Sequence, residues 1–331
     1  MDPSLLEPYA GRRCLVTGGL GFIGSNLAVA LDAAGAEVVV VDSLVPRHGG
    51  NRRNLTGTTN TRVVIADISD RAAVGEPAGA ADVVFNLAGQ VSHVDSMADP
   101  QFDLEVNARS QLGFLDLLRS VNPEAVVVFT STRQIFGHPH YLPVDEEHPV
   151  SPVDVNGITK WAAEQFHMLY HDVYGLRSTS LRLTNVYGPR QRLRDNFQGF
   201  LPIFVRLAME DETITVFGDG AQERDCLYVD DVVECLLRAG ATDAAAGEFF
   251  NIGNDERLSL RQIADAVVAA AGSGRVELGP WPRDRDAIDI GSYYGDSSKA
   301  KRILGWSPST DFADGIARTV EFYEGHRNWY L

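Results

Sequence analysis

The fold of this 331-residue chain is decided by residues 14–42, which read CLVTGGLGFIGSNLAVALDAAGAEVVVVD. Two short apolar runs flank a glycine-rich turn and an apolar stretch with helical spacing. The first run enters Gly18-Gly19-Leu20-Gly21-Phe22-Ile23-Gly24, and the second run ends at Asp42. Because strand, glycine-rich turn, helix and second strand follow one another directly, the segment predicts the first βαβ unit of a parallel sheet.

The glycines at this turn suit a bound dinucleotide. They permit a tight turn, close approach of the backbone to a pyrophosphate and close helix–strand packing, while the helix N-terminus faces the phosphate charge. Asp42 can accept hydrogen bonds from an adenosine ribose diol and would repel a 2′-phosphate, which favours NAD over NADP. Three arginines downstream leave NADP open as an alternative. At this turn the expected cofactor-binding residues are Gly18, Gly21, Phe22, Ile23, Gly24 and Asp42.

Further apolar runs recur along the first half of the chain, at RVVIAD, DVVFNLAG and AVVVFTS. Continuous rather than alternating apolarity is typical of strands that are buried on both faces, so we expect an α/β fold with a doubly wound parallel sheet. After residue 185 the pattern changes to helices near 199–210, 230–239, 258–271 and 311–325, with short strands at TITVF and EFFNI. We therefore expect a Rossmann domain over 1–185 and a smaller C-terminal α/β substrate domain over 186–331, with segments that can cross between them.

Composition narrows the class of partner. The net charge of −16 makes nucleic acid and anionic membranes improbable partners, because both are negatively charged. Three cysteines without CxxC spacing argue against a disulfide framework and a zinc site. With neither a signal peptide nor a long apolar stretch in the sequence, we expect a cytoplasmic protein without a metal centre.

Ordered motifs over about 290 residues give the chain a family resemblance. They are TGGLGFIG, Asp42, NLAGQ, Asn107, FTSTRQIFG, the 156–160 segment, LRLTNVYGPRQ, VFGDGAQERDCLYVDD and SSKAKRILGWSP. In this set and order the chain resembles the extended short-chain dehydrogenase/reductase family of NAD-dependent sugar-nucleotide epimerases and dehydratases. The resemblance implies NAD as cofactor and a nucleoside-diphosphate sugar as substrate. Beyond the first turn, the expected cofactor-binding residues are Asp67, Ile68, Leu87, Ala88, Gln90, Asn107, Lys160 and Leu183.

The catalytic motif of that family is incomplete here. Its members place a tyrosine and a lysine four residues apart on one helix, beside a Ser or Thr at a strand end. Thr132 and Lys160 occupy two of these positions, but Asn156 stands where the tyrosine is expected. An amide has no acid–base equilibrium near neutral pH, so Asn156 cannot be the base. The chain can be a natural subgroup with another base, an engineered inactive variant, or a redox-silent binding protein.

Four side chains are candidates for a replacement base. His93 follows the fourth strand, and histidine is the residue type whose unperturbed pKa lies closest to neutral pH, so His93 is the leading candidate. Tyr141 and His140 precede the helix that carries Asn156, and Lys160 would serve if burial lowered its pKa. A lone histidine at such a place more often lies on the surface or behind the residues that touch the substrate.

Arg133 and Gln134 follow Thr132, where the 4,6-dehydratases of the family carry an Asp-Glu pair. A cation and an amide cannot remove water in the same way, which disfavours that dehydratase reaction. Arg133 could pair with a carboxylate or hydroxyl of the substrate, or with a carboxylate of the protein. The resemblance implies epimerisation through a transient keto-sugar, with C4 favoured over C2. A redox-silent nucleotide-sugar-binding protein and a dehydratase of unusual mechanism are the alternatives.

The resemblance also assigns the substrate end and a dimer. The expected substrate-binding residues are Asn185, Gln198, Phe217, Arg224 and Arg283, with Arg285 as an alternative to Arg283. Apolar residues in the helices near 100–120 and 155–175 resemble the helix bundle through which family members form homodimers, although core packing would also explain them.

Overall fold

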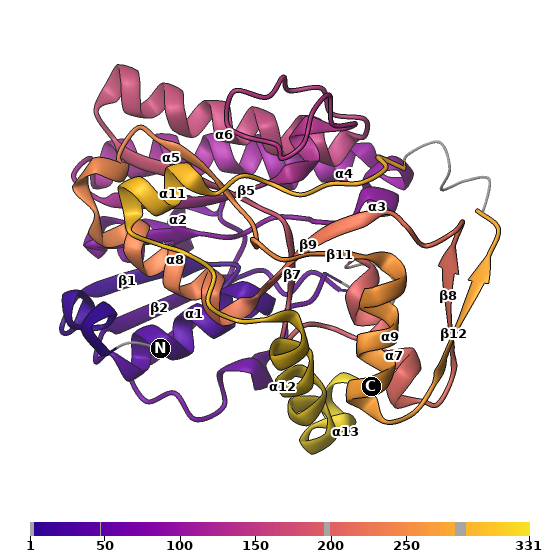
Figure 1. The fold of residues 1–331 in the computed structure, drawn as a ribbon. Coiled ribbons are helices and arrows are strands. Elements are labelled where there is room, and N and C mark those ends of the chain that lie inside the picture. The colour runs from indigo at the N-terminus through magenta and orange to yellow at the C-terminus, as the bar shows by residue number, and fades with distance from the viewer. Residues whose placement is uncertain (1–2, 47, 195–198, 282–288) are drawn as a thin grey trace.

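A seven-stranded parallel sheet runs through the computed structural model, which describes residues 3–46, 48–194, 199–281 and 289–331 (Figure 1). Its strand order is β10-β6-β5-β4-β1-β2-β3, so the chain winds outward in both directions from the neighbours β1 and β4. This confirms the predicted doubly wound α/β class. The strands are β1 (Arg13–Thr17), β2 (Glu37–Asp42), β3 (Thr61–Ile65), β4 (Val83–Asn86), β5 (Val126–Thr132), β6 (Arg177–Leu183) and β10 (Phe249–Ile252).

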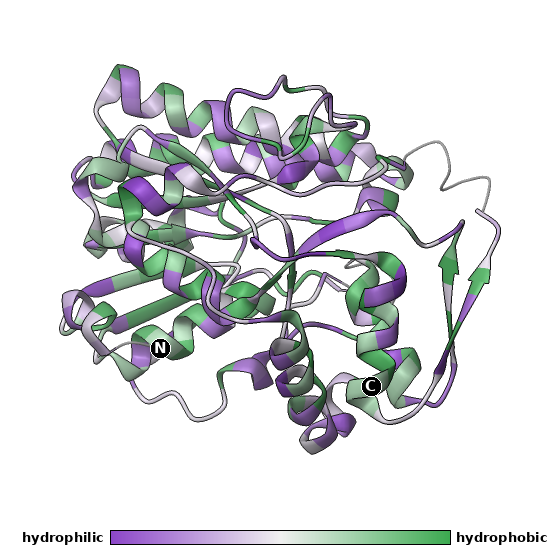
Figure 2. Cartoon of the chain, viewed as in Figure 1, coloured by the Kyte–Doolittle hydropathy of each residue, from purple (hydrophilic) through white to green (hydrophobic). Residues whose placement is uncertain are grey.

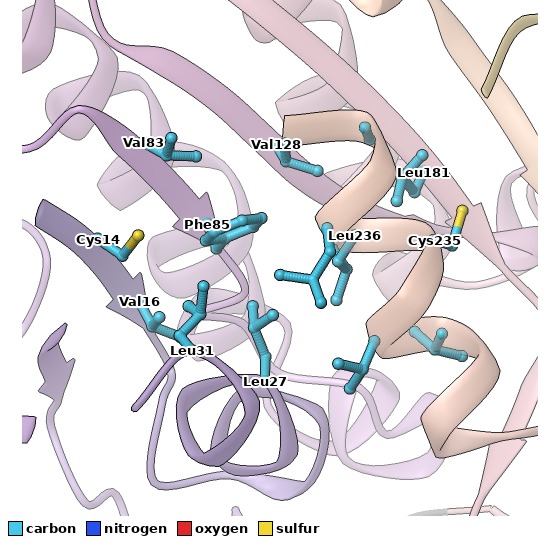
Figure 3. Close-up of a cluster of buried hydrophobic side chains, with 14 of the residues drawn as sticks. Cys14, Val16, Leu27, Leu31, Val83, Phe85, Val128, Leu181, Cys235 and Leu236 are labelled. Atoms are coloured by element: carbon cyan, nitrogen blue, oxygen red, sulfur yellow. The ribbon is translucent and has the colours of Figure 1, made fainter. Parts of the chain in front are cut away.

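Both faces of this sheet are covered by helices. Cys14 and Val16 of β1 pack in a core with α1 (Phe22–Ala33) and α8 (Val229–Ala241), part of which Figure 3 shows. Leu15, between them, points into a separate core with α2 (Arg71–Ala80) and α5 (Ser110–Val121). Because helices cover both faces, apolar residues predominate in β1, β2, β4 and the first half of β5, as the green central strands in Figure 2 show, whereas β6 reads RSTSLRL and buries several polar side chains.

The helix α6 (Val155–Tyr174), which carries the incomplete motif, is fixed at both ends. Asp154 caps its start, because Oδ1 accepts a hydrogen bond from the Gly157 amide at 2.7 Å. Gly175 ends it in the left-handed conformation, with φ +76°. Preceding elements on this side are α3 (His93–Ala98), α4 (Pro100–Leu104) and a π-helical turn (Glu105–Arg109) that leads into α5.

A smaller part of the fold is built around a second core. It contains a three-stranded sheet of β7 (Asn185–Tyr187), β9 (Glu223–Tyr228) and β11 (Arg257–Ser259), and the parallel pair β8 (Thr213–Phe217) and β12 (Arg275–Gly279). Its helices are α7 (Phe200–Met209), α9 (Leu260–Ala271), α12 (Phe312–Gly325) and α13 (Arg327–Tyr330). Helices were predicted close to α7, α8, α9 and α12. The boundary at residue 185 stays a prediction, and α8 and β10 cross back to the large sheet after it.

The remaining regular elements are short. They are α11 (Ser298–Leu304) and 3₁₀ turns at Pro3–Leu5, Glu7–Tyr9, Arg52–Leu55, Arg133–Phe136 and Asp243–Ala245. Among the described residues, no helix combines the length and apolarity that crossing a bilayer requires.

Candidate functional site

A cavity of about 730 Å³ lies at the carboxyl ends of the parallel strands, where ligands bind in open α/β sheets. Nearly all the predicted site residues that the structure describes line it: Gly18, Gly21, Phe22, Ile23, Gly24, Asp42, Asp67, Ile68, Leu87, Ala88, Gln90, His93, Thr132, Arg133, Asn156, Lys160, Leu183, Asn185, Phe217 and Arg224. Asn107 is buried behind the wall. The predictions for Gln198, Arg283 and Arg285 fall outside the described residues.

The glycine turn at the end of β1 has no room for side chains at Gly18 and Gly24, because a Cβ at either position would meet backbone atoms. Gly18 has φ +66°, and a Cβ there would lie 2.8 Å from the Leu87 carbonyl oxygen. At Gly24 a Cβ would collide with the Gly18 carbonyl oxygen. The turn therefore brings β1, β4 and the first residues of α1 into close contact, and the α1 N-terminus borders the cavity. This cradle fits a pyrophosphate.

Asp42 is held at the end of β2 by two backbone amides. Its carboxylate accepts hydrogen bonds from Leu44 N–H at 2.8 Å and from Leu20 N–H at 3.0 Å. Burial raises the pKa of this carboxyl above its usual value, although the two amides oppose the rise. The residue lines the cavity in the place that an adenosine ribose would require.

Lys160 is buried at the cavity wall. Its ammonium donates a hydrogen bond to the Thr130 carbonyl oxygen at 2.8 Å. Burial lowers its pKa to about 8, while the charges of Asp103 and Glu164 oppose the fall. Thr132, two residues along β5, caps the next turn by accepting from Gln134 N–H at 3.2 Å.

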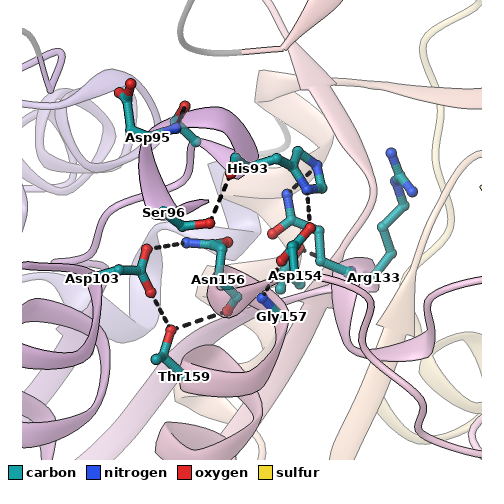
Figure 4. A network of polar contacts seen from close by, with 12 residues as sticks. His93, Asp95, Ser96, Asp103, Arg133, Asp154, Asn156, Gly157 and Thr159 are labelled. Atoms are coloured by element: carbon teal, nitrogen blue, oxygen red, sulfur yellow. Dashed lines mark hydrogen bonds and ion pairs between the residues drawn. The ribbon is translucent and has the colours of Figure 1, made fainter. Parts of the chain in front are cut away.

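The Asn156 side chain is engaged in a buried network rather than pointing freely into the cavity (Figure 4). Its amide nitrogen lies 2.9 Å from the Gln90 carbonyl oxygen, 3.2 Å from Gln90 Oε1 and 3.0 Å from Asp103 Oδ2. Asp103 also accepts from the Thr159 hydroxyl, and Asn107 bonds both backbone groups of Gln90. Asn156 thus ties the segment after β4 to α4 and α6.

His93 lines the cavity and pairs with the buried carboxylate of Asp154. Its Nδ1 meets the Asp154 carboxylate, and its Nε2 lies 2.6 Å from the Gln134 side-chain nitrogen. Burial raises the pKa of Asp154, but the bonds from His93 and the Gly157 amide outweigh it, so the pKa is lowered. The imidazole is about one-third exposed, whereas the carboxylate is almost wholly enclosed. His93 is therefore oriented by the cap of α6.

The substrate end of the cavity holds two guanidinium groups. Arg133 donates to Asn185 Oδ1 at 3.3 Å, and its Cζ lies 5.0 Å from the centre of the Tyr293 ring. Arg224 donates to the carbonyl oxygens of Glu223 and Gly291 at 2.9 and 2.6 Å. Burial, helped by the charge of Arg133, lowers the pKa of Arg224 to about 10.

Sequence reasoning missed Asp154, Asp103 and Trp281. Asp154 gave a visible helix-start signal, an aspartate three residues before a glycine amide, but nothing near it pointed to His93. Asp103 lies in a short helix without a motif. Trp281 lines the cavity in contact with Phe217, with ring centres 5.6 Å apart and ring planes tilted by 47°, and such an aromatic surface suits a planar base.

Comparison with known proteins gives a family match across most of the chain. Residues 14–253 match the NAD-dependent epimerase/dehydratase family. A UDP-glucose 4-epimerase of Mycolicibacterium smegmatis is 35% identical over 313 residues, which cover 94% of this chain and 98% of that protein.

Solved structures agree with that match. A UDP-glucose 4-epimerase of Thermotoga maritima, solved with UDP-glucose, has a TM-score of 0.85 and 30% identity, covering 95% of this chain and 99% of that one. A dTDP-glucose 4,6-dehydratase of Streptomyces venezuelae, solved with NAD bound, has a TM-score of 0.86 and 29% identity, with 96% and 98% covered.

Replacing Asp42 with asparagine should weaken the preference for NADH over NADPH. The amide keeps the size and one acceptor but removes the charge that repels a 2′-phosphate, so we expect the affinity ratio to shift at least tenfold toward NADPH. Fluorescence titration with both reduced cofactors measures it. Asp32→Asn is the matched control, because Asp32 also accepts from backbone amides but lies outside the cavity. An unchanged ratio in Asp42→Asn would place the ribose elsewhere.

Proposed function

Because the chain belongs to the NAD-dependent epimerase/dehydratase family and uses NAD as its cofactor, we propose that it is an epimerase of a nucleoside-diphosphate sugar. The reaction would oxidise one sugar carbon transiently to a ketone, with C4 favoured over C2, and reduce it again from the other face. The observation that carries the proposal is the His93–Asp154 pair, set in the wall of the cavity that Thr132 and Lys160 also line. A cytoplasmic location stays a prediction.

Bound NAD supplies the hydride acceptor, and the chain must supply a base for the sugar hydroxyl. With its Nδ1 proton donated to Asp154, neutral His93 keeps a lone pair on Nε2. The adjacent carboxylate stabilises the imidazolium that forms when this lone pair takes a proton. We therefore assign the base to His93, and the orientation of its ring to Asp154.

Gln134 can follow the change of charge on His93. In the neutral state its amide N–H donates to Nε2. A sugar hydroxyl would displace that donor to reach the lone pair. Once Nε2 carries a proton, the Gln134 Oε1 atom can accept it after the side-chain amide turns over, and Oε1 is a buried atom without a hydrogen-bond partner in the described part of the chain.

The other candidate bases have weaker support. His140 and Tyr141 are not among the residues that line the cavity. The Tyr141 hydroxyl donates to Asp145 at 2.6 Å, and this bond raises its pKa to about 12, which opposes proton abstraction at neutral pH. Burial does lower the pKa of Lys160 to about 8, but its ammonium donates to the Thr130 carbonyl oxygen, and the family resemblance assigns this lysine to the cofactor ribose.

Removing the imidazole should abolish epimerisation while leaving ligand binding intact. For His93→Asn we expect turnover to fall about 10²–10⁴-fold, the usual contribution of a general base. Turnover should fall less in Asp154→Asn. Asparagine also caps helices, so this change removes only the negative charge that faces the His93 ring. NMR of the wild-type protein with a panel of nucleotide sugars in deuterated buffer identifies the substrate, and the same assay ranks the variants.

His140→Asn is the matched control, since this histidine does not line the cavity. Full turnover in His93→Asn would refute His93 as the base. Tight nucleotide binding without turnover of any sugar by the wild type would favour the redox-silent alternative, and loss of water from the sugar would favour the dehydratase.

Restoring the family tyrosine should harm the protein. Asn156→Tyr removes the amide that donates to Gln90 and Asp103 and puts a bulkier ring in a buried site, so the buried Asp103 Oδ2 loses its donor from Asn156. We expect the free energy of unfolding to fall by about 2–4 kcal/mol and turnover to fall at least tenfold. Urea unfolding and the NMR assay measure the two effects, with Asn156→Ala as the control for lost bonds without added bulk. A rise in turnover would show that the phenol, not His93, is the better base here.

A homodimer is part of the proposed function. Four large apolar side chains, Ile158, Trp161, Leu169 and Val173, recur at helical spacing along α6 and are 38–58% exposed. Leu112 is exposed on α5, which packs beside α6. The inward residues of the same helices, such as Phe114 and Leu115, are fully buried. The outer stripe thus exceeds what the monomer core requires and supports a helix-bundle interface.

Light scattering with size-exclusion chromatography should give twice the chain mass. Leu169→Glu should shift the protein toward the monomer, because a charge would be buried at the interface. Leu278→Glu is the matched control, as Leu278 is equally exposed but lies on β12. A monomeric wild type would contradict the dimer.

A further inference from the structure

Polar atoms without partners gather at the carboxyl end of β5. Ser131 Oγ, Arg133 Nη1 and Gln134 Oε1 are buried, and none of them has a hydrogen-bond partner among the described residues. All three residues line the cavity. Leaving a buried polar atom unpaired is costly, so such a cluster marks a place where a polar ligand group can complete the bonding. Gln134 Oε1 is explained by the proton cycle of His93, whereas Ser131 and Arg133 are not.

The Arg133 guanidinium also lacks a counter-ion. Its hydrogen bond goes to a neutral amide, that of Asn185, and it forms no ion pair with any described residue. Two carboxylates feel its charge, but each is bound elsewhere: Asp154 to His93 and Gly157, and Asp225 to Thr184 and Gly295. Although the chain has a net charge of −16, the Arg133 guanidinium at the cavity wall thus has no carboxylate partner among the residues that the structure describes.

Arg224 adds a second positive charge to the same cavity. Its hydrogen bonds go to two backbone carbonyls and the Gln222 amide oxygen, which are all neutral acceptors. Burial and then repulsion by Arg133 lower the pKa of Arg224, while the charges of Asp289 and Asp225 oppose the fall without forming a hydrogen bond to either guanidinium. Two partly desolvated guanidinium groups near each other favour a ligand that brings negative charge. The diphosphate can neutralise Arg224, and Arg133 adjoins Thr132, on the side where the sugar would react.

We propose that the sugar carries a carboxylate, so that the substrate is a nucleoside-diphosphate uronic acid whose acid group binds Arg133. The inference rests on the proposed function, because it assigns the substrate class of that same site. A guanidinium fork matches a carboxylate in charge and geometry, and the Ser131 hydroxyl supplies a further donor. A neutral sugar hydroxyl would fill a hydrogen bond but leave the buried charge uncompensated.

Isothermal titration of the NAD-loaded protein tests the assignment. UDP, dTDP, GDP, CDP and ADP are titrated first, and the tightest nucleotide is then compared as its glucuronate and its glucose conjugate at 0.15 M salt. We expect the glucuronate to bind at least tenfold more tightly than the glucose conjugate. In Arg133→Gln this preference should disappear, with the glucose conjugate changed less than about threefold, and Arg133→Lys should restore part of it.

Arg257→Gln is the matched control, because Arg257 stacks on Tyr294 at the same 5.0 Å distance but does not line the cavity. Equal affinity for the two conjugates in the wild type would overturn the inference, as would a uniform loss for both conjugates and the bare nucleotide in Arg133→Gln, which would assign Arg133 to the diphosphate. If no nucleotide binds the loaded protein, the proposed function itself fails.

Discussion

The Asn156 carboxamide, clamped between Gln90 and Asp103, fixes the segment after β4 against the start of α6. The rest of the site depends on this contact. Gln90 lies three residues before His93, and Lys160 lies one helical turn after Asn156, so the clamp sets the relative positions of the candidate base and the buried ammonium. An amide can serve several acceptors at once, whereas a phenol has one proton to donate. Asn156, at the position where the family resemblance leads us to expect a tyrosine, therefore has an architectural task.

Strands, turns and helices could be predicted because each has a local sequence signal. Contacts between residues that lie far apart in the chain could not. Residues 14–42 predict the strand, turn and helix because each step has its own local signal, and the buried strands follow from their continuous apolarity. The contact of His93 with Asp154 joins residues 61 apart, and that of Asn156 with Asp103 joins residues 53 apart. These pairs form when α3 and α4 pack against the start of α6, and no local pattern encodes that packing. The sequence around Asp154 indicates a helix cap, but it does not indicate the contact with His93.

Ion-paired arginines and arginines that meet only neutral acceptors lie in different parts of this molecule. The surface carries the acidic excess, and its arginines are mostly paired with carboxylates a turn away or on a neighbouring element. Deep in the fold, Arg182 is likewise matched by Glu164. Arg133 and Arg224 differ from these arginines, because their hydrogen bonds go to neutral acceptors. The net negative charge thus disfavours polyanions, while the two cations in the cavity favour the small anion that we propose as ligand.

A histidine base changes what the lysine must do. A tyrosine has an unperturbed pKa of about 10, so bringing it near 7 takes roughly three pKa units, or about 4 kcal/mol of differential stabilisation from neighbouring positive charge. An imidazole titrates at about 6.5 and needs no such help. In the proposed site Lys160 is therefore released from tuning a phenol, and its buried ammonium can serve cofactor binding alone. Asp154 takes over the electrostatic task on the base from inside the cap of α6, where the helix N-terminus already stabilises a carboxylate. In the proposed site a base that needs no help from the lysine and an amide at position 156 are compatible, because the Asn156 contacts with Gln90 and Asp103 hold the segment that leads to His93 against the start of α6.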